Sequence, residues 1–284
     1  MSILVFGSTG NNGRAVVQQL LQQGADFTAA ITHPDRAKLL PKGAKHIVCR
    51  FDEPTSIIEA LASHSKVFLL VPFHEQMVAW GKRVIEQAKS ANIQQIIRIT
   101  AWDAALDSAS KMSQLHSQID TSLVDSGINY TILRCNSFMQ NFTHLYGAMI
   151  KQKKGFYLAE GNAKSAFVST DDIGEAVANL LLENVRRDRM ILDITGQELL
   201  SNIDVAQIIS DELGATILYH SIDPTVVNKG YRAQGLSEWK IEVLGSLTNY
   251  INSGHAARIC PELMHLLGRT PTSFRSFAHQ YKQC

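Results

Sequence analysis

The residues Ile3-Leu4-Val5-Phe6-Gly7-Ser8-Thr9-Gly10-Asn11-Asn12-Gly13 carry the strongest indication of the fold. The apolar run from Ile3 to Phe6 predicts a buried strand, and the apolar periodicity from Asn12 to Gln23 predicts an amphipathic helix. Three glycines separate these two elements, and a second apolar run, Phe27 to Ile31, follows the helix. A strand, a glycine-rich turn, a helix and a second strand in this order are typical of a dinucleotide-binding unit.

The three glycines have separate physical roles in such a turn. Gly7 permits the tight turn, Gly10 lets the backbone approach a pyrophosphate, and Gly13 allows the helix to pack closely on the strand. The free amides at the start of the helix then point at the bound anion. We therefore expect the cofactor to contact Gly7, Ser8, Thr9, Gly10, Asn11, Asn12 and Gly13.

The residues after the second strand bear on which dinucleotide is bound. An acidic side chain there holds the 2′-hydroxyl of the adenosine ribose, whereas an arginine accommodates a 2′-phosphate. The chain offers Thr32 and His33, then Asp35 beyond a proline that turns the chain away, and then Arg36. We favour NADP, held by Thr32, His33 and Arg36. A solvated arginine at a helix start is an equal alternative, so NAD stays open.

Residues at the ends of later strands complete the expected cofactor site, because ligands of such folds lie outside the carboxyl ends of the strands. The residues concerned are Phe51, Asp52, Val71, Pro72, Thr100 and Ala101. The first pair is expected to flank the adenine, and the second pair to line the path toward the nicotinamide.

Apolar runs alternate with amphipathic stretches through the first half of the chain. Short runs bounded by polar or turn residues predict further strands at 47–49, 67–71, 96–100 and 130–133. Helical periodicity predicts further helices at 56–61, 75–91 and 112–125. This alternation predicts an α/β fold, a Rossmann doubly wound parallel sheet with right-handed crossovers.

Helices dominate the second half of the chain. Their periodicity is found at 138–151, 172–183, 203–213 and 261–267. Ser201 and Asp204 resemble a capping box, and Gly214 gives the matching stop. We expect residues 1–135 to form an NAD(P)-binding Rossmann domain, with parts of 165–200 crossing back to it. Residues 136–284 are expected to form a smaller, mostly helical substrate-binding domain.

Composition restricts the class of protein. Of the 284 residues, 45 % are hydrophobic, which is enough to bury a sizeable core. Lys and Arg number 27 against 26 Asp and Glu, so the net charge of +1 indicates no nucleic-acid partner. The sequence shows neither a membrane-length apolar run nor a signal peptide, so we expect a cytoplasmic protein. The cysteines Cys49, Cys135, Cys260 and Cys284 are too scattered for a disulfide framework or a metal site, and we expect reduced thiols.

Further motifs accompany the glycine-rich turn. They are Thr32-His33-Pro34, Phe51-Asp52, Tyr130-Thr131-Ile132-Leu133-Arg134, Ser137-Phe138-Met139-Gln140-Asn141-Phe142, Ala166-Phe167-Val168-Ser169-Thr170-Asp171-Asp172-Ile173 and Thr195-Gly196. With these motifs nearly the whole chain resembles the NmrA-like branch of atypical short-chain dehydrogenases. The resemblance implies a Rossmann domain that binds NAD(P) and a small C-terminal domain that closes over a substrate cleft. It also implies three kinds of relative: NADPH-dependent quinone reductases, agroclavine-type dehydrogenases that reduce an iminium, and sensors that bind NAD(P) without catalysis.

One departure from standard short-chain dehydrogenases concerns the proton donor. Those enzymes use a serine after the fifth strand and a Tyr-x-x-x-Lys pair on the next helix. Here Thr100-Ala101-Trp102 takes the place of the serine, and the helix carries His116 and Asp120 instead of the pair. An iminium or extended quinone accepts hydride with little proton assistance, so positioning alone would serve. Alternatively His116, titrating near neutrality, donates the proton and is the candidate catalytic residue, although a surface helix histidine is an equal interpretation.

Aromatic and amide side chains are candidates for contact with a small-molecule substrate, with simple packing as the alternative. They are Phe73, Trp102, Phe138, Asn141 and Tyr157. The sequence thus predicts an NAD(P)H-dependent reductase of a small apolar electrophile, namely a quinone, an imine or iminium, or an enone. The alternative is a non-catalytic NAD(P)-binding redox sensor that presents its C-terminal domain to a protein partner. We expect a monomer or homodimer, and we disfavour a sugar epimerase because that chemistry also uses the missing tyrosine and lysine.

Overall fold

The computed structural model describes residues 2–183 and 189–283, and the chain divides into two compact units. The first unit contains the residues up to Leu106, together with Leu115–Arg134 and Thr170–Leu192. The second contains Asp107–Gln114, Cys135–Ser169 and the chain from Asp193 onward. The chain therefore passes between the two units several times, and each unit is described below by itself.

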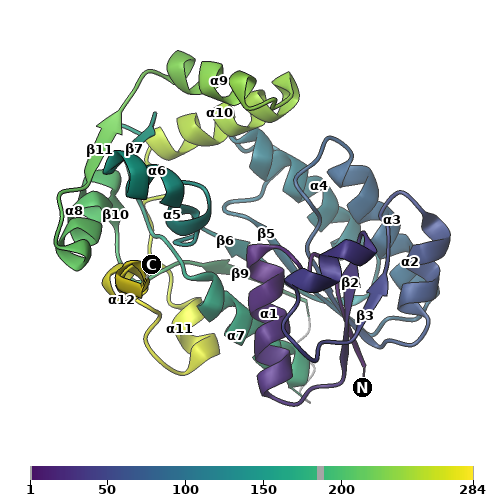
Figure 1. Cartoon of the computed structure of the whole chain (residues 1–284). Coiled ribbons are helices and arrows are strands. Elements are labelled where there is room, and N and C mark those ends of the chain that lie inside the picture. Colours follow the sequence, from purple (N-terminus) through teal and green to yellow (C-terminus); the bar gives the residue numbers. More distant parts are fainter. Residues whose placement is uncertain (1, 184–188, 284) are drawn as a thin grey trace. The chain divides into compact units, whose positions relative to one another are not determined.

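A seven-stranded sheet organises the first unit, in the order β3-β2-β1-β4-β5-β6-β9 (Figure 1). The strands are β1 (Ile3–Val5), β2 (Phe27–Ile31), β3 (His46–Val48), β4 (Lys66–Leu69), β5 (Gln95–Ala101), β6 (Asn129–Cys135) and β9 (Met190–Ile194). The pairs β1–β2, β2–β3, β1–β4 and β4–β5 are parallel. This order reverses between β1 and β4, as in dinucleotide-binding sheets, and confirms the predicted fold class.

Helices connect these strands. They are α1 (Asn11–Gln22), α2 (Pro54–Leu61), α3 (Met77–Ser90), α4 (Lys111–Asp125) and α7 (Thr170–Leu182), with a short 3-10 helix at Pro34–Leu39. The α1 connection runs from β1 toward β2, whereas those through α2, α3 and α4 run the opposite way along the sheet. Because such crossovers are right-handed, α1 and the other three helices cover opposite faces of the sheet.

Small residues allow the helices of one face to approach closely. Figure 1 shows α1 and α7 side by side, and a Cβ built on Gly174 of α7 would lie 2.7 Å from the backbone of Ala15 in α1. In the same way, a Cβ on Gly81 of α3 would lie 2.7 Å from the Ile119 side chain of α4. Both glycines are therefore required by helix packing and not by a turn.

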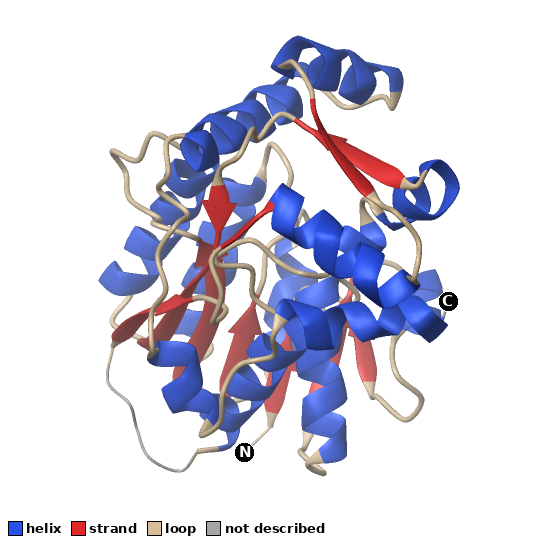
Figure 2. Ribbon diagram, turned by 90° about the vertical axis from the view of Figure 1, so that its left-hand side faces the viewer, coloured by secondary structure: helices blue, strands red, loops and turns tan. Residues whose placement is uncertain are grey.

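The second unit is mostly helical. Its helices are α5 (Asn141–His144), α6 (Gly147–Lys153), α8 (Asn202–Leu213), α9 (Pro224–Ala233), α10 (Glu238–Asn252), α11 (Glu262–Leu267) and α12 (Phe274–Ala278), followed by a 3-10 turn at His279–Gln283. Four short strands accompany them: β7 (Gly155–Leu158), β8 (Lys164–Ser165), β10 (Leu200–Ser201) and β11 (Leu218–Ser221). Strands β7 and β11 form a parallel pair, visible as a separate ribbon in Figure 2, and β8 pairs antiparallel with β10.

An aromatic core holds the second unit together. The ring of Phe142 lies 5.5 Å from Phe156, 5.4 Å from Phe167 and 5.3 Å from Phe274, each in an edge-to-face arrangement. Such pairs are stabilised beyond the burial of their area, by about 0.5–1.5 kcal/mol each. Because Phe274 belongs to α12, the core fixes the C-terminal helix against residues more than a hundred positions earlier.

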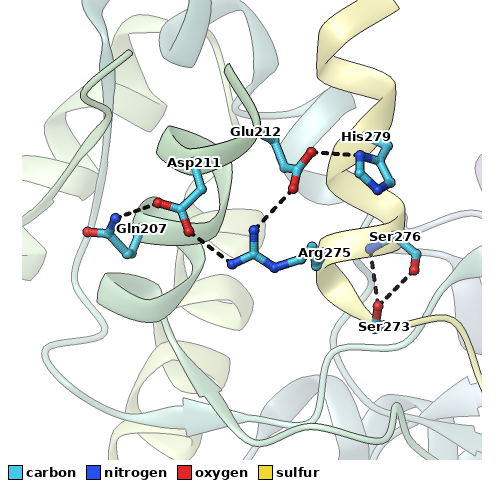
Figure 3. Close-up of polar contacts among 7 residues, drawn as sticks. All are labelled: Gln207, Asp211, Glu212, Ser273, Arg275, Ser276 and His279. Atoms are coloured by element: carbon cyan, nitrogen blue, oxygen red, sulfur yellow. Dashed lines mark hydrogen bonds and ion pairs between the residues drawn. The ribbon is translucent and has the colours of Figure 1, made fainter. Parts of the chain in front are cut away.

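Charged side chains anchor the same C-terminal helix to α8 (Figure 3). Arg275 donates to Asp211 at 2.9 Å and to Glu212 at 3.1 Å, and Nδ1 of His279 lies 2.6 Å from the second oxygen of Glu212. Glu212 is nearly buried, with its side chain 6 % exposed, so its charge needs these partners.

The structure corrects several predictions in the second half. The single helix predicted at 138–151 is two helices, α5 and α6, separated at Leu145 and Tyr146. Strands β7 to β11 and helices α9, α10 and α12 were not predicted. In contrast, the capping box of Ser201 and Asp204 and the left-handed Gly214 are confirmed at the two ends of α8.

The structure describes three of the four cysteines. Among the described residues, Cys49, Cys135 and Cys260 are not in disulfide bonds, and Cys284 lies outside the described part of the chain. Burial raises the pKa of Cys49 to about 11, so this thiol stays protonated and unreactive at neutral pH.

None of the helices in the described part of the chain has the length and hydropathy needed to cross a bilayer.

Candidate functional site

The glycine-rich turn between β1 and α1 has the geometry that its sequence predicts. Gly7 has a φ of +69°, and a Cβ there would lie 2.8 Å from the carbonyl oxygen of Leu70. A Cβ on Gly13 would lie 2.1 Å from the carbonyl oxygen of Gly7, so no larger residue fits. Gly10 is exposed, and a Cβ there would lie 3.6 Å from the nearest atom, the carbonyl oxygen of Gly7. Gly7 and Gly13 therefore shape the turn, whereas Gly10 leaves a surface that a ligand can approach.

The start of α1 presents positive electrostatic potential without a side chain to neutralise it. Gly10 is the N-cap residue, no side chain caps the helix, and the first turn has no acidic residue. The amides of Asn11, Asn12 and Gly13 therefore lie at the positive end of the helix dipole, where an anion is stabilised. Asn12 adds a buried Oδ1 atom that has no hydrogen-bond partner among the described residues.

Arg36 lies beside this turn. Its Nε atom donates a 2.9 Å hydrogen bond to the Thr9 hydroxyl, although the two residues are 27 positions apart. The nearby Asp35 is held by His33, whose Nδ1 accepts from the Asp35 amide at 3.2 Å. Thr32, His33 and Arg36 are all exposed after β2. The structure thus brings a guanidinium, and not a carboxylate, to the turn.

Other predicted cofactor residues have partners inside the first unit. The Ser8 hydroxyl is buried and donates to the Ala30 carbonyl at 2.7 Å, so it joins the turn to β2. The Phe51 ring packs on Phe6 and Trp80, with centroids 5.7 and 5.6 Å away. Asp52 and Pro72 are exposed and Val71 is buried. The expected cofactor contacts of these residues stay predictions.

A buried polar network lies next to the predicted catalytic position. Arg98 of β5 is completely buried and donates from Nε to Asp120 of α4 at 2.6 Å. The Thr100 hydroxyl donates to the other Asp120 oxygen at 2.8 Å. A second Arg98 nitrogen, Nη2, lies 3.1 Å from Nδ1 of His116, one turn before Asp120 on α4. The side chains of His116 and Asp120 are therefore connected through Arg98.

This network determines the state of His116. A guanidinium only donates hydrogen bonds, so Nδ1 of His116 must accept and the ring proton must reside on Nε2. Burial, with a further contribution from the Arg98 charge, lowers the pKa of His116 to about 3. The imidazole is consequently neutral at physiological pH. The expectation that His116 titrates near neutrality is wrong, because it took no account of Arg98.

Sequence reasoning did not identify Arg98 as part of the site, although a signal is present. Arg98 interrupts the apolar run of β5 two residues before Thr100, so both side chains lie on the same face of the strand. His116 and Asp120 are four residues apart and share a face of α4. A charged residue at the centre of a buried strand requires a partner, and a carboxylate on the following helix is the natural one.

The predicted substrate residues are divided between the units. Phe73 and Trp102 belong to the first unit, where Trp102 is buried and Phe73 is half-buried. Phe138, Asn141 and Tyr157 belong to the second unit and are all half-buried. Tyr157 stacks on His220 at 4.6 Å, on the face of β7 opposite to the core residue Phe156. Within 2–183 and 189–283, no cluster of His, Cys, Asp and Glu could hold a metal ion.

The doubly wound sheet and its glycine-rich turn define the chain as a Rossmann protein of the dinucleotide-binding class. The model of the NmrA-like family matches residues 1–259. The chain therefore belongs to the NmrA-like family, and the resemblance noted in the sequence is confirmed.

Three known proteins illustrate the relationship. An NAD(P)H azoreductase from Xenophilus azovorans is 26 % identical over 277 residues, which cover 97 % of this chain and 96 % of the relative. The structure of a triphenylmethane reductase from Citrobacter sp. superimposes with a TM-score of 0.87 at 20 % identity and covers both chains completely. An NADPH-dependent quinone oxidoreductase from Escherichia coli, in complex with NADPH, gives a TM-score of 0.86 at 20 % identity over 99 % of both chains.

Proposed function

We propose that this protein is an NAD(P)H-dependent reductase that transfers hydride to a small electrophile, with NADPH as the preferred donor. The observation that carries the proposal is the uncapped, acid-free start of α1 with Arg36 beside it. The coarser assignment, an NAD(P)-dependent oxidoreductase, agrees with the activities named for the azoreductase and quinone oxidoreductase relatives.

The residues present fit a phosphorylated dinucleotide. Amides of the turn and of the first turn of α1 suit the pyrophosphate, because both the free donors and the helix dipole favour negative charge. Arg36 suits a 2′-phosphate, since a planar guanidinium pairs well with phosphate oxygens. When bound, the reduced nicotinamide supplies the hydride. The chain itself must bind and orient the cofactor and the substrate, and it must exclude water.

His116 acts in this proposal as a hydrogen-bond donor and not as a proton donor. Its neutral ring carries the proton on Nε2, held in that tautomer by Arg98. Such a group can stabilise developing negative charge on an oxygen or nitrogen acceptor without giving up its proton. Electrophiles that need little proton transfer suit this arrangement best, and these are iminium ions and extended quinones.

The first experiment tests the choice of dinucleotide with Arg36→Ala. A hydrogen bond to a charged group contributes about 1.5–3 kcal/mol, so NADPH affinity should fall by about tenfold or more, while NADH affinity stays within about twofold. Calorimetric titration of each reduced cofactor measures this. Lys38→Ala removes an exposed cation from the same 3-10 helix and serves as the control. An unchanged ratio of the two affinities would remove Arg36 from the site.

The second experiment separates the reductase from the redox sensor. Loss of NADPH absorbance is followed after mixing with a panel of quinones, imines, iminium salts and enones. Turnover of at least one acceptor supports the reductase. Tight binding of oxidised and reduced cofactor with no turnover of any acceptor would favour the sensor, and failure to bind either cofactor would overturn both functions.

A further inference from the structure

A second cluster of polar side chains lies in the second unit, around the carboxyl group of Glu160. Glu160 follows β7 in a tight turn, where its carbonyl accepts from the Ala163 amide at 3.0 Å. The preceding residue is fixed as well, because the side chain of Asn252 donates to the Ala159 carbonyl at 2.8 Å. The position of the Glu160 side chain is therefore set by the surrounding backbone.

Asn202 binds this carboxyl group directly. Its side-chain nitrogen donates to Oε2 of Glu160 at 2.8 Å, while its own Oδ1 is buried and has no partner among the described residues. Asn202 is only 1 % exposed and opens α8, whose start is locked by the capping box of Ser201 and Asp204. The pair thus presents a carboxyl group together with an unsatisfied amide oxygen.

Three tyrosines are electrostatically coupled to the same carboxyl group. Tyr146 is the N-cap residue of α6, Tyr219 lies on β11, and Tyr231 lies on α9. Burial raises the pKa of each tyrosine, and the charge of Glu160 raises it further. All three remain partly exposed. The hydroxyl of Tyr219 donates to the Leu158 carbonyl at 3.3 Å, whereas those of Tyr146 and Tyr231 make no hydrogen bond to the described part of the chain.

The Glu160 carboxyl group has no cationic partner among the described residues. Within residues 2–183 and 189–283, no lysine, arginine or histidine lies within ion-pair distance of Glu160. Burial raises the pKa of Glu160, which is the expected result for a carboxylate without a counter-ion. Proteins normally pair such groups, so a site with a carboxylate, an orphan amide oxygen and aromatic rings suits an incoming cation.

We propose that Glu160, Asn202 and the tyrosines Tyr146, Tyr219 and Tyr231 form a subsite for a flat aromatic cation. The carboxylate and the amide oxygen face the positive charge, and the aromatic rings bind its π surface. This subsite lies wholly within the second unit, so the inference goes beyond the proposed function. Binding itself requires neither cofactor nor turnover, so it can be tested separately.

The experiment compares two probes of the same shape, the cation N-methylisoquinolinium and the neutral 2-methylnaphthalene. Glu160→Gln retains an oxygen that can accept from Asn202 but removes the charge. Calorimetric titration without dinucleotide should show at least about tenfold weaker binding of the cation, and a change within about twofold for the neutral probe. Glu242→Gln, an exposed change of equal charge in the same unit, should alter neither.

A second measurement uses the unaltered protein and so does not depend on folding of the variant. Because the pKa of Glu160 is raised and a cation favours the ionised form, binding of N-methylisoquinolinium should release protons in mildly acidic buffer. The released protons are counted from titrations in two buffers of different ionisation heat. The other titratable groups that couple to Glu160 are the hydroxyls of Tyr146, Tyr219 and Tyr231, which stay protonated throughout this range.

Equal affinity of the two probes for the unaltered protein, or cation binding without proton release, would overturn the subsite. So would unchanged cation binding by a folded Glu160→Gln variant. A protein that binds the cation in this way yet never oxidises NADPH would leave the subsite in place and overturn only the reductase.

Discussion

Arg98 controls the chemistry available to His116. Arginine keeps its charge when buried, and here its Nη1 atom has no hydrogen-bond partner in the described chain. Asp120 neutralises Arg98 through Nε, and Thr100 orients Asp120. Replacing Arg98 would leave Asp120 uncompensated and is expected to unfold the site, since breaking a buried ion pair costs about 3–5 kcal/mol. His116 is therefore the better position at which to test the network.

A pair of substitutions tests the role of His116. His116→Gln can still accept from Arg98 with its oxygen and donate from its nitrogen, whereas His116→Ala can do neither. We expect kcat to fall by about 10²-fold for alanine, as for loss of one donor to a developing charge, and much less for glutamine. Cofactor affinity should stay close to that of the parent in both variants. Steady-state kinetics and NADPH titration measure these effects.

The pH profile gives a second readout for the same residue. Because the pKa of His116 is about 3, titration of this residue should cause no step in kcat of the parent near pH 6.5. The pH profiles of the parent and of His116→Gln should therefore have the same shape in that range. A step near pH 6.5 that disappears in the variant would show that the imidazolium form is the active one. Equal kcat of the alanine variant and the parent would remove His116 from the catalytic site altogether.

Residues whose function depends on local pattern could be predicted from the sequence, and those whose function depends on a distant partner could not. Gly7, Gly10 and Gly13 are defined by the turn that contains them. His116 was selected by its place on the helix, but its protonation state depends on Arg98, which lies 18 positions earlier on a strand. Glu160 gave no sequence signal, because its neighbours come from four other elements.

The C-terminal helix α12 offers a prediction at the scale of one element. Arg275→Ala removes the hydrogen bonds to Asp211 and Glu212, so the nearly buried Glu212 keeps only His279 among the contacts in Figure 3. Leaving such a group partly unsatisfied costs about 1–3 kcal/mol, so amide exchange over residues 274–281 should become about tenfold faster or more. Hydrogen exchange with mass spectrometry measures this. Arg232→Ala breaks a comparable pair with Glu238 and should leave α12 unchanged.

Acid should act on α12 in the same direction. Arg275, and to a lesser extent Gln207, hold the pKa of Asp211 below its ordinary value. A carboxyl group with a lowered pKa in the folded state stabilises above its unfolded pKa, and this contribution is lost as pH falls through the folded pKa. Relative to the intrinsic exchange rate at each pH, the protection of α12 should therefore decrease below about pH 4 in the parent, and less so in Arg275→Ala. An α12 that exchanges equally in both proteins at every pH would show that the aromatic core alone holds it.

Most elements of the first unit could be predicted because most of them are buried, whereas the partly buried β9 was missed. Strands β1, β4 and β5 are apolar almost without interruption, as expected in a parallel sheet covered on both faces. Strands β8 and β10 have two residues each, which is too short for any periodic signal. Helix α9 buries none of its residues, so the expected burial of a core helix does not apply to it. The missed elements are those whose place depends on pairing or packing with distant segments.

The start of α1 lacks a capping side chain that would stabilise the whole chain, and we attribute this to function. A helix normally gains stability from a capping side chain, yet here the N-cap is Gly10 and its amides remain uncapped. The backbone of Gly10 is in the extended region, with φ of −84° and ψ of 172°, and a Cβ there would have room. A capping residue therefore fits sterically. The proposed cofactor site accounts for its absence, because a carboxylate cap would occupy the place we propose for the pyrophosphate and repel it.

This explanation predicts opposite effects of one substitution on stability and on binding. Gly10→Asp should cap α1 and add an acidic group at its positive end, raising Tm of the ligand-free protein by about 2–4 °C for a gain near 1 kcal/mol. NADPH at about one hundred times its Kd should stabilise the parent by about 2.7 kcal/mol, and this increment should vanish in the variant. Gly10→Asn caps without charge, so it should raise Tm less than Gly10→Asp and lose less of the NADPH effect. Thermal unfolding of the three proteins, with and without NADPH, measures both quantities. If Gly10→Asp kept the full NADPH stabilisation, the pyrophosphate would have to bind elsewhere than at the start of α1.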